Sequence, residues 1–266
     1  MTQIQKIELL FGPAEIKQTL PSAFENTTCI IFDILRFTSS ATMALANGAK
    51  AVIPVESIGE ALKIHKLHPD FLLAGERNGS KITASLSGSK NFHLGNSPRE
   101  YVREVIDGKT IISTTTNGTM ALTHCKTAMQ VMVASFFNMK ASVNWLLHHP
   151  TPRVCLVCSG THGENSYEDM LGAGAFADLL ISSFLFSGIL PRYSDSVLAC
   201  RLLYQQAAQK GLTEHFALSR NGKALHSIPA LAQDVAFSAR SDLFDFPILL
   251  CKDGALRTSQ NWILGV

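Results

Sequence analysis

Short runs of apolar residues recur along the chain up to position 159, and most of them are separated by stretches long enough to form a helix. Within each run the apolar residues follow one another almost without interruption, which is typical of strands that are covered on both faces. The pattern therefore predicts a mainly parallel or mixed sheet. Its expected strands are KIELLF (6–11), TCIIFDI (28–34), AVIPV (51–55), FLLAG (71–75), TIIST (110–114), MQVMVAS (129–135) and RVCLVCS (153–159).

Several of the intervening stretches begin with residues that favour a helix start. Ser57 stands three residues before Glu60, a spacing in which both side chains can bind backbone amides of the first turn. Similar signals at Ser97 and at Ser166 precede helices expected over 101–106 and 170–180. Strands that alternate with helices predict an α/β protein with a three-layer α/β/α fold, in which ligands bind at the carboxyl ends of the strands.

The pattern changes after Pro191. Two helices are expected over 194–211 and 213–222, followed by a strand pair within PILLCKDGALRT (247–258), whose turn is Asp253-Gly254. We therefore interpret residues 1–266 as a single domain with a core of about 1–190 and a helical and hairpin C-terminal extension of about 191–266.

Composition narrows the class of protein. Of the 266 residues, 46% are hydrophobic and 17% are charged, and the formal net charge is +2. This balance is typical of a globular protein and lacks the basic excess that nucleic acids attract, so no nucleic-acid partner is expected. The first residues lack a signal-peptide pattern, and the longest apolar stretch, Leu179 to Leu190, is too short to span a bilayer. We expect a cytoplasmic protein without a membrane partner, whose cysteines are reduced.

Acids, arginines and hydroxyl groups follow four of the expected strands at the point where each strand ends. Because the carboxyl ends of parallel strands meet at one edge of a sheet, we expect these side chains to form a single pocket. Arginine forks suit a phosphate or carboxylate ligand, and the carboxylates suit Mg²⁺. The residues include Asp33, Arg36, Glu76, Arg77, Thr115, Thr116, Asn117, Thr161, Glu168 and Asp169.

The stretch IISTTTNGTMAL (111–122) joins one of these strands to a helix-like segment through three threonines and Asn117-Gly118. One interpretation is a turn followed by a helix cap, which such residues commonly form. The other is an anion site, because the free N–H groups and dipole of a helix N-terminus favour negative charge and threonine hydroxyls add donors. The polar residues at the other strand ends favour the anion site.

Five blocks of the chain carry most of these polar residues. They are DILRFTSSATMALANGAKAVIPV (33–55), GERNG (75–79), LGNSPREY (94–101), TTTNGT (114–119) and CSGTHGENSYEDMLGAG (158–174). In this order the blocks resemble the 2-phosphosulfolactate phosphatases, and a looser similarity, QDVAFSARSDLFDFP, covers 233–247. The resemblance spans most of the chain, so it is far more specific than any single motif.

The resemblance implies an α/β/α hydrolase that removes phosphate from 2-phospho-3-sulfolactate in coenzyme M biosynthesis, with Mg²⁺ as cofactor. One segment departs from the family pattern, because KITASLSGSKNFH (81–93) is longer than the usual link and has Asn91 where glycine is expected. The physiological substrate therefore stays open. The positions that the resemblance assigns to the site are Asp33, Arg36, Ser39, Glu76, Arg77, Asn96, Ser97, Thr114, Thr115, Thr116, Asn117, Ser159, Thr161, Glu168 and Asp169.

On this interpretation the partner is a small phosphorylated 2-hydroxy acid. Asp33, Glu76 and Asp169 would hold Mg²⁺. The two arginines and the loop that ends at Gly118 would bind the phosphoryl oxygens and the substrate carboxylate. The sequence leaves open whether Asp33 is a metal ligand or a nucleophile that forms an acyl phosphate. A homodimer is one assembly compatible with the sequence.

Two alternatives belong to other classes. CKDGALRT (251–258) has the C-x-x-G-x-x-R-T spacing of cysteine-dependent phosphatases, with Cys251 as nucleophile and Arg257 binding the phosphate. That loop must run into a helix, whereas Asp253-Gly254 favours a hairpin. A non-catalytic anion-binding module would keep the arginines and lose the acids, but this chain has both.

Overall fold

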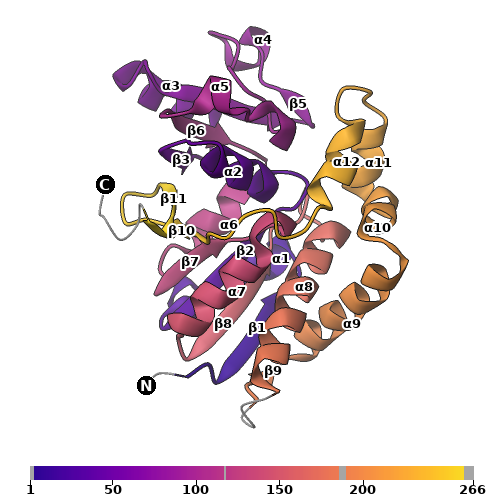
Figure 1. Ribbon diagram of the computed structural model, residues 1–266. Helices are drawn as coiled ribbons and strands as arrows, with labels where there is room; N and C mark the ends of the chain where they lie inside the picture. The colour runs from indigo at the N-terminus through magenta and orange to yellow at the C-terminus, as the bar shows by residue number, and fades with distance from the viewer. Residues whose placement is uncertain (1–2, 117, 186–189, 261–266) are drawn as a thin grey trace.

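The computed structural model describes residues 3–116, 118–185 and 190–260 (Figure 1). Within these ranges one sheet of eleven strands has the order β5-β4-β6-β3-β11-β10-β7-β2-β8-β1-β9. The strands are β1 (Lys6–Leu10), β2 (Thr27–Phe32), β3 (Ala51–Pro54), β4 (Leu72–Arg77), β5 (Ser80–Lys81), β6 (Thr110–Thr114), β7 (Gln130–Val133), β8 (Arg153–Cys158), β9 (Arg192–Tyr193), β10 (Ile248–Leu250) and β11 (Leu256–Thr258). The helices are α1 (Pro13–Gln18), α2 (Phe37–Ala46), α3 (Ile58–Leu67), α4 (Ala84–Ser87), α5 (Arg103–Ile106), α6 (Gly118–Cys125), α7 (Met139–His148), α8 (Tyr167–Phe184), α9 (Asp195–Lys210), α10 (Leu212–Leu218), α11 (Arg220–His226) and α12 (Ala232–Ser238).

The strands expected from the apolar runs are all present, as β1, β2, β3, β4, β6, β7 and β8. The expected helix start at Ser57 is confirmed, because the Ser57 side chain accepts a hydrogen bond from the Glu60 amide in the first turn of α3. The start at Ser166 leads into the long helix α8. The prediction of an α/β/α fold with a mixed sheet is therefore confirmed.

Two expected helices differ from the structure. Over 101–106 only the short helix α5 forms, because the backbone of Val102 is extended and the buried Tyr101 hydroxyl donates to the Gly95 carbonyl. The helix expected over 213–222 is divided into α10 and α11 at Ser219. The backbone of Ser219 is extended, and its hydroxyl accepts a hydrogen bond from the Gly222 amide. Tertiary contacts and local capping thus override the helical pattern.

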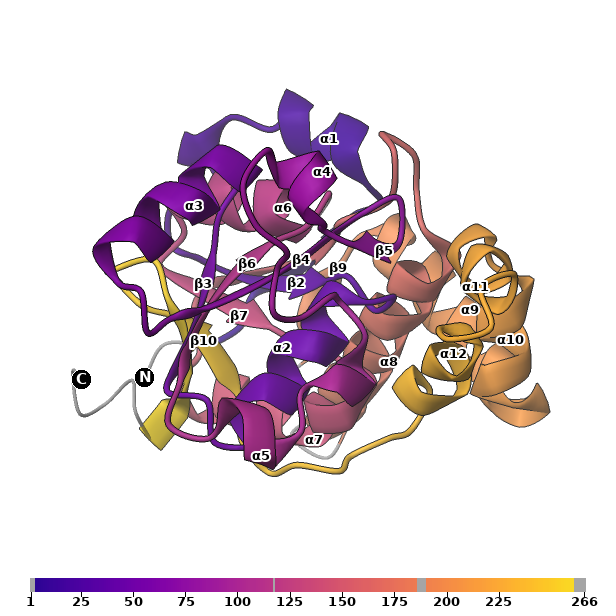
Figure 2. The same cartoon turned by 90° about the horizontal axis from the view of Figure 1, so that it is seen from above.

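Helices cover both faces of the sheet. Successive residues of β2 face opposite sides, so Ile30 and Phe32 belong to one apolar cluster and Cys29 and Ile31 to another. The first cluster includes residues of α7, α8 and α9, and the second includes residues of α1, α2 and α6. Figure 1 shows α7 and α8 in front of the strands, and both views show α9 to α12 gathered along one side of the molecule (Figures 1 and 2).

The sheet consists of two parallel segments joined by a hairpin. One segment contains β7, β2, β8, β1 and β9, and the other contains β4, β6 and β3. Between them, the pairs β7–β10, β10–β11 and β11–β3 are all antiparallel. Three antiparallel steps reverse the strand direction, so the two segments run in opposite senses. The sequence predicted that the polar residues would meet at one edge of a single parallel sheet. The structure instead has two oppositely directed segments with a junction between them.

The hairpin comes from the C-terminal part of the chain. Its turn at Asp253-Gly254 is confirmed by two backbone hydrogen bonds, from the Cys251 amide to the Ala255 carbonyl and from the Gly254 amide to the Cys251 carbonyl. Asp253 also pairs with Arg257. Because β10 is antiparallel to β7, Cys251 lies near the start of β7, at the amino ends of the strands in that parallel segment. The segment interpreted as an extension thus supplies two central strands.

The described helices were also compared with the length and hydropathy that a bilayer requires. Within the described ranges, no helix combines enough length with enough hydrophobicity to cross a membrane.

The central position of the hairpin yields a stability prediction. Leu249 in β10 is 1% exposed, so Leu249→Ala should lower the free energy of unfolding by about 2–5 kcal/mol, the usual cost of a cavity in a core. Leu67→Ala, at a leucine 76% exposed, is the matched control and should change it by less than about 0.5 kcal/mol. Urea denaturation measures both. Equal effects would show that the hairpin is not part of the core.

Candidate active site

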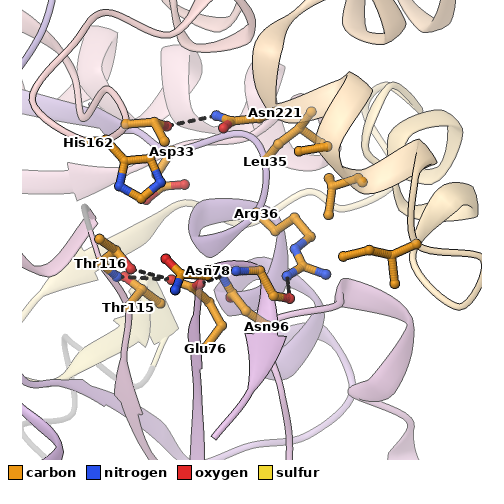
Figure 3. Close-up of a pocket in the computed structure, with 15 residues that line it drawn as sticks. Asp33, Leu35, Arg36, Glu76, Asn78, Asn96, Thr115, Thr116, His162 and Asn221 are labelled. Carbon is orange, nitrogen blue, oxygen red and sulfur yellow. Dashed lines mark hydrogen bonds between the residues drawn. The ribbon is translucent and has the colours of Figure 1, made fainter.

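A cavity of about 200 Å³ lies where the loops after β2, β4, β6 and β8 meet helix α11 (Figure 3). It is thus bordered by both parallel segments of the sheet. One wall is polar, and the other includes the apolar side chains of Leu35, Leu225 and Ile228. The expected site residues that line it are Asp33, Arg36, Glu76, Asn96, Thr115, Thr116 and Thr161.

Other expected site residues lie close by but do not line the cavity. Three of them act through backbone groups. Ser39 donates to the Ile34 carbonyl, and Asp169 accepts hydrogen bonds from the amides of Ile34 and Gly160. Arg77 donates to two backbone carbonyls and to the Thr114 hydroxyl. These contacts shape the loops, and neither Arg77 nor Asp169 lines the cavity.

The remaining expected residues do not line the cavity, and most of them belong to segments next to it. The Ser97 hydroxyl donates to Asp234, and the buried Glu168 carboxylate accepts from Asn221. Ser159 follows β8 with its backbone amide bound to Phe32. Gly118 begins α6. Asn117 lies outside the described residues.

Asp33 is buried at the centre of the polar wall. It accepts a hydrogen bond from the Phe37 amide at 3.3 Å and another from the Gly118 amide at the start of α6. A Cβ atom at Gly118 would lie 2.7 Å from an Asp33 oxygen, so only glycine allows this approach. Burial raises the pKa of Asp33 to about 7, and the nearby charges of Glu76 and Glu168 raise it as well. Among the described residues, no lysine or arginine forms an ion pair with Asp33, whose named partners are backbone amides.

Glu76 organises the threonine loop. One carboxylate oxygen accepts from both the amide and the hydroxyl of Thr116, and the other accepts from the Gly79 amide at 2.8 Å. Figure 3 shows this bonded group beside Thr115. The Thr115 hydroxyl and the Asn96 side-chain oxygen are buried and have no hydrogen-bond partner among the described residues. Buried polar atoms are normally paired, so these two indicate where a polar ligand binds.

Arg36 is the only lysine or arginine among the described residues that line the cavity. Its guanidinium donates to Asp234 at 2.9 Å and to the Gly79 carbonyl at 2.6 Å. Both members of this ion pair are buried, with exposed fractions of 3% and 0%. Arg99 also donates to Asp234, so these three side chains together carry one positive charge. The described lining itself has two carboxylates, Asp33 and Glu76, and one guanidinium.

Four lining or supporting residues were not expected from the sequence as site residues. They are Asn78, His162, Asn221 and Asp234. Asn78 and His162 have positive φ angles of 53° and 52°, a backbone conformation that residues other than glycine rarely adopt. His162 and Gly163 form a tight turn between Thr161 and Glu164. Neither Asn221 nor Asp234 follows a strand, so only the looser similarity over 233–247 pointed toward Asp234.

Comparison with known proteins gives a consistent result. A family model described as 2-phosphosulpholactate phosphatase matches residues 14–252. A probable 2-phosphosulfolactate phosphatase of Thermotoga petrophila is 39% identical over 225 residues, which cover 84% of this chain and 88% of that protein. A protein of the same name from Caldanaerobacter subterraneus is 37% identical over 237 residues, covering 88% and 91%. This chain belongs to the 2-phosphosulfolactate phosphatase family.

Family membership confirms the resemblance found in the sequence and places the chain among phosphoric monoester hydrolases. The family match also covers α11 and α12, which supply part of the cavity and its support. Within the described residues, no group of three or more histidine, cysteine, aspartate or glutamate side chains is arranged to hold a metal ion.

The raised pKa of Asp33 has a consequence for stability. In EDTA, the folded state holds the Asp33 proton up to about pH 7, whereas the unfolded state releases it near pH 4. The contribution of Asp33 to the free energy of unfolding is therefore fully present below pH 4 and is lost as the pH rises toward 7. Asp33→Asn cannot ionise, so its melting temperature relative to wild type should rise between pH 4 and 8, by an amount equivalent to a few kcal/mol at most.

The exposed Asp70→Asn is the control for this experiment, and its difference from wild type should stay constant with pH. Thermal unfolding followed by circular dichroism across the pH range measures both. A constant offset for Asp33→Asn would contradict the raised pKa.

Proposed function

We propose that this chain is a Mg²⁺-dependent phosphatase that hydrolyses the phosphate monoester of a small 2-hydroxy acid. The observation that carries the proposal is the composition of one cavity wall: a buried carboxylate, a guanidinium and two unpartnered buried polar groups face the same small space. Such a wall suits a phosphoryl group that is bound together with a cation.

The charges of the lining support the cation. A phosphate monoester is an anion, yet the described lining contains the carboxylates of Asp33 and Glu76 and one guanidinium, that of Arg36, which already donates to Asp234. Binding an anion here without further positive charge would be strongly unfavourable. Mg²⁺ commonly uses one or two carboxylates and completes its shell with phosphate oxygens and water, so three protein carboxylates are not required.

Asp33 is the best placed ligand, and the Glu76 oxygen that accepts only from Gly79 is the second candidate. Asp169 is assigned a different role, because both of its oxygens hold backbone amides of the loops after β2 and β8. When bound, Mg²⁺ would supply the positive charge that offsets the phosphoryl oxygens.

The other groups bind and orient the substrate. The Thr115 hydroxyl is available to donate to a phosphoryl oxygen, whereas the Thr116 hydroxyl already binds Glu76. Arg36 retains donors that can bind a phosphoryl or carboxylate oxygen. The start of α6 beside Asp33 adds positive potential. These fixed donors stabilise charge that develops during transfer, which is the principal route to catalysis of phosphoryl transfer.

The relatives carry the name probable 2-phosphosulfolactate phosphatase, and that acid is a substrate of the proposed class. The longer segment 81–93 does not line the cavity, because Ile82 and Phe92 pack with Leu73 and Ile112 in a separate apolar cluster. Its length therefore gives no reason to place the substrate outside the class suggested by the family.

Two alternatives receive less support. A cysteine-dependent mechanism would need Cys251 at the cavity, but this residue lies in the hairpin near the start of β7 and does not line the cavity. Cys251→Ser should therefore leave turnover near wild type. A non-catalytic module has no use for the buried acid Asp33, so an inactive wild-type protein that binds phosphate tightly would favour it.

Metal dependence provides a direct test. Hydrolysis of 2-phosphosulfolactate or another 2-phospho-hydroxy acid should stop after exhaustive EDTA treatment and return with Mg²⁺, because the lining lacks the charge to bind the ester alone. Phosphate release measures activity, and calorimetry with inorganic phosphate should detect binding only when Mg²⁺ is present. Full activity in EDTA would remove the metal from the proposal.

A substitution at Thr115 distinguishes a structural role of the threonine loop from ligand binding. Thr115→Val should lower kcat by about a hundredfold, as loss of one donor to a developing oxyanion does elsewhere, with little change in melting temperature. The matched control is Thr123→Val, on the exposed side of α6, which should keep wild-type kcat. Steady-state kinetics measure both variants. Wild-type kcat for Thr115→Val would place the phosphoryl group elsewhere.

A further inference from the structure

Asp234 lies in α12, more than 190 positions after Arg36, and is completely buried. One of its oxygens accepts from Arg36 at 2.9 Å. The other accepts from the Ser97 hydroxyl at 2.7 Å and from Arg99 at 2.8 Å. A single carboxylate thus joins three groups that precede it by more than 130 positions to the C-terminal helices.

These bonds determine how Arg36 is oriented. One terminal nitrogen of its guanidinium donates to Asp234, and the other donates to the Gly79 carbonyl at 2.6 Å. A guanidinium has five N–H donors in one plane, so two fixed contacts define that plane and leave about three donors for a ligand. Arg36 also lines the cavity. Its remaining donors are therefore held in a set direction before any ligand binds.

Other contacts hold Asp234 in turn. Arg99 donates to the Gln233 side chain and to the Ala230 carbonyl, next to or within α12. Arg99 is partly exposed, with 31% of its side chain accessible, and it does not line the cavity. It therefore offers a comparison residue that shares the carboxylate of Asp234 but has no contact with a ligand.

We propose that Asp234 is the positioning residue for Arg36, and that through it α12 controls the arginine that binds the substrate's anionic group. The proposal rests on the function proposed above for its kinetic readout. Asp234 itself does not touch the substrate. Its effect on turnover passes entirely through the orientation of the Arg36 guanidinium.

A double-mutant cycle tests this path. Asp234→Asn should lower kcat by about tenfold to a hundredfold, because a misplaced binding group of this kind has effects of that size. Arg36→Gln should lower kcat at least as much. In the Arg36→Gln background, adding Asp234→Asn should change kcat by less than about threefold, because the group that Asp234 positions is already absent. Effects that multiply would overturn the proposal.

Asp234→Asn alone leaves the buried Arg36 without its charged partner, so this variant could fail to fold. The cycle remains informative in that case. The double variant Arg36→Gln/Asp234→Asn has no unpaired Arg36 guanidinium. Its kcat compared with that of Arg36→Gln alone is sufficient to test the proposal. A further loss of kcat in the folded double variant would show an independent structural role for Asp234. The control is Arg99→Gln, which should keep kcat within about threefold of wild type, because Asp234 still binds Ser97 and Arg36 without Arg99.

Nuclear magnetic resonance of ¹⁵N-labelled arginine supplies a readout that does not need activity. In wild type, the Arg36 terminal N–H groups should give separate signals because rotation of the guanidinium is hindered. These signals should merge in Asp234→Asn and stay separate in Arg99→Gln. Separate signals in Asp234→Asn would contradict the proposal. Separate wild-type signals in a protein without phosphatase activity would leave the positioning intact and reject only the proposed function.

Discussion

Arg36 is the only guanidinium in the described cavity lining, beside the buried carboxylates of Asp33 and Glu76, and it is already bound to Asp234. The arrangement of the site follows from this shortage of positive charge. Arg36 is paired with Asp234, so Asp33 is buried with backbone amides as its partners and its pKa rises. A buried carboxylate held in this way is strongly unfavourable as an anion unless a cation binds beside it. The same deficit explains why an anionic ester and a divalent cation are expected to bind together.

The topology of the sheet brings these groups to one place. Its two parallel segments run in opposite senses, and the hairpin of β10 and β11 connects them at the centre. The cavity therefore lies at a junction, where loops from both segments meet the C-terminal helices. Asp169 and Arg77 hold the backbone of those loops, while Asp234 ties α12 to Arg36. Support of this kind keeps the groups that face a ligand in fixed positions.

The apolar runs and the polar residues after them predicted the strands and much of the cavity lining, because both signals are local in the sequence. The reversal between the two segments was not predictable, since it depends on where the hairpin pairs. Asp33 and Thr115 follow strands, Glu76 lies at the end of β4, and all three were expected. Asn221 and Asp234 instead come from helices far along the chain. The sequence identified Asp169 by its chemistry, but only the structure shows that its oxygens bind backbone amides.

The central claim is that a cation and a phosphoryl group share this cavity, with Asp33 on the cation. It is tested most directly by crystallography of the protein with Mn²⁺ in place of Mg²⁺ and vanadate as a phosphoryl analogue. We predict an anomalous peak of Mn²⁺ within bonding distance of the Asp33 carboxylate, with vanadate oxygens in contact with Arg36 and Thr115. A metal peak elsewhere, or vanadate bound in this cavity without any metal, would contradict the account.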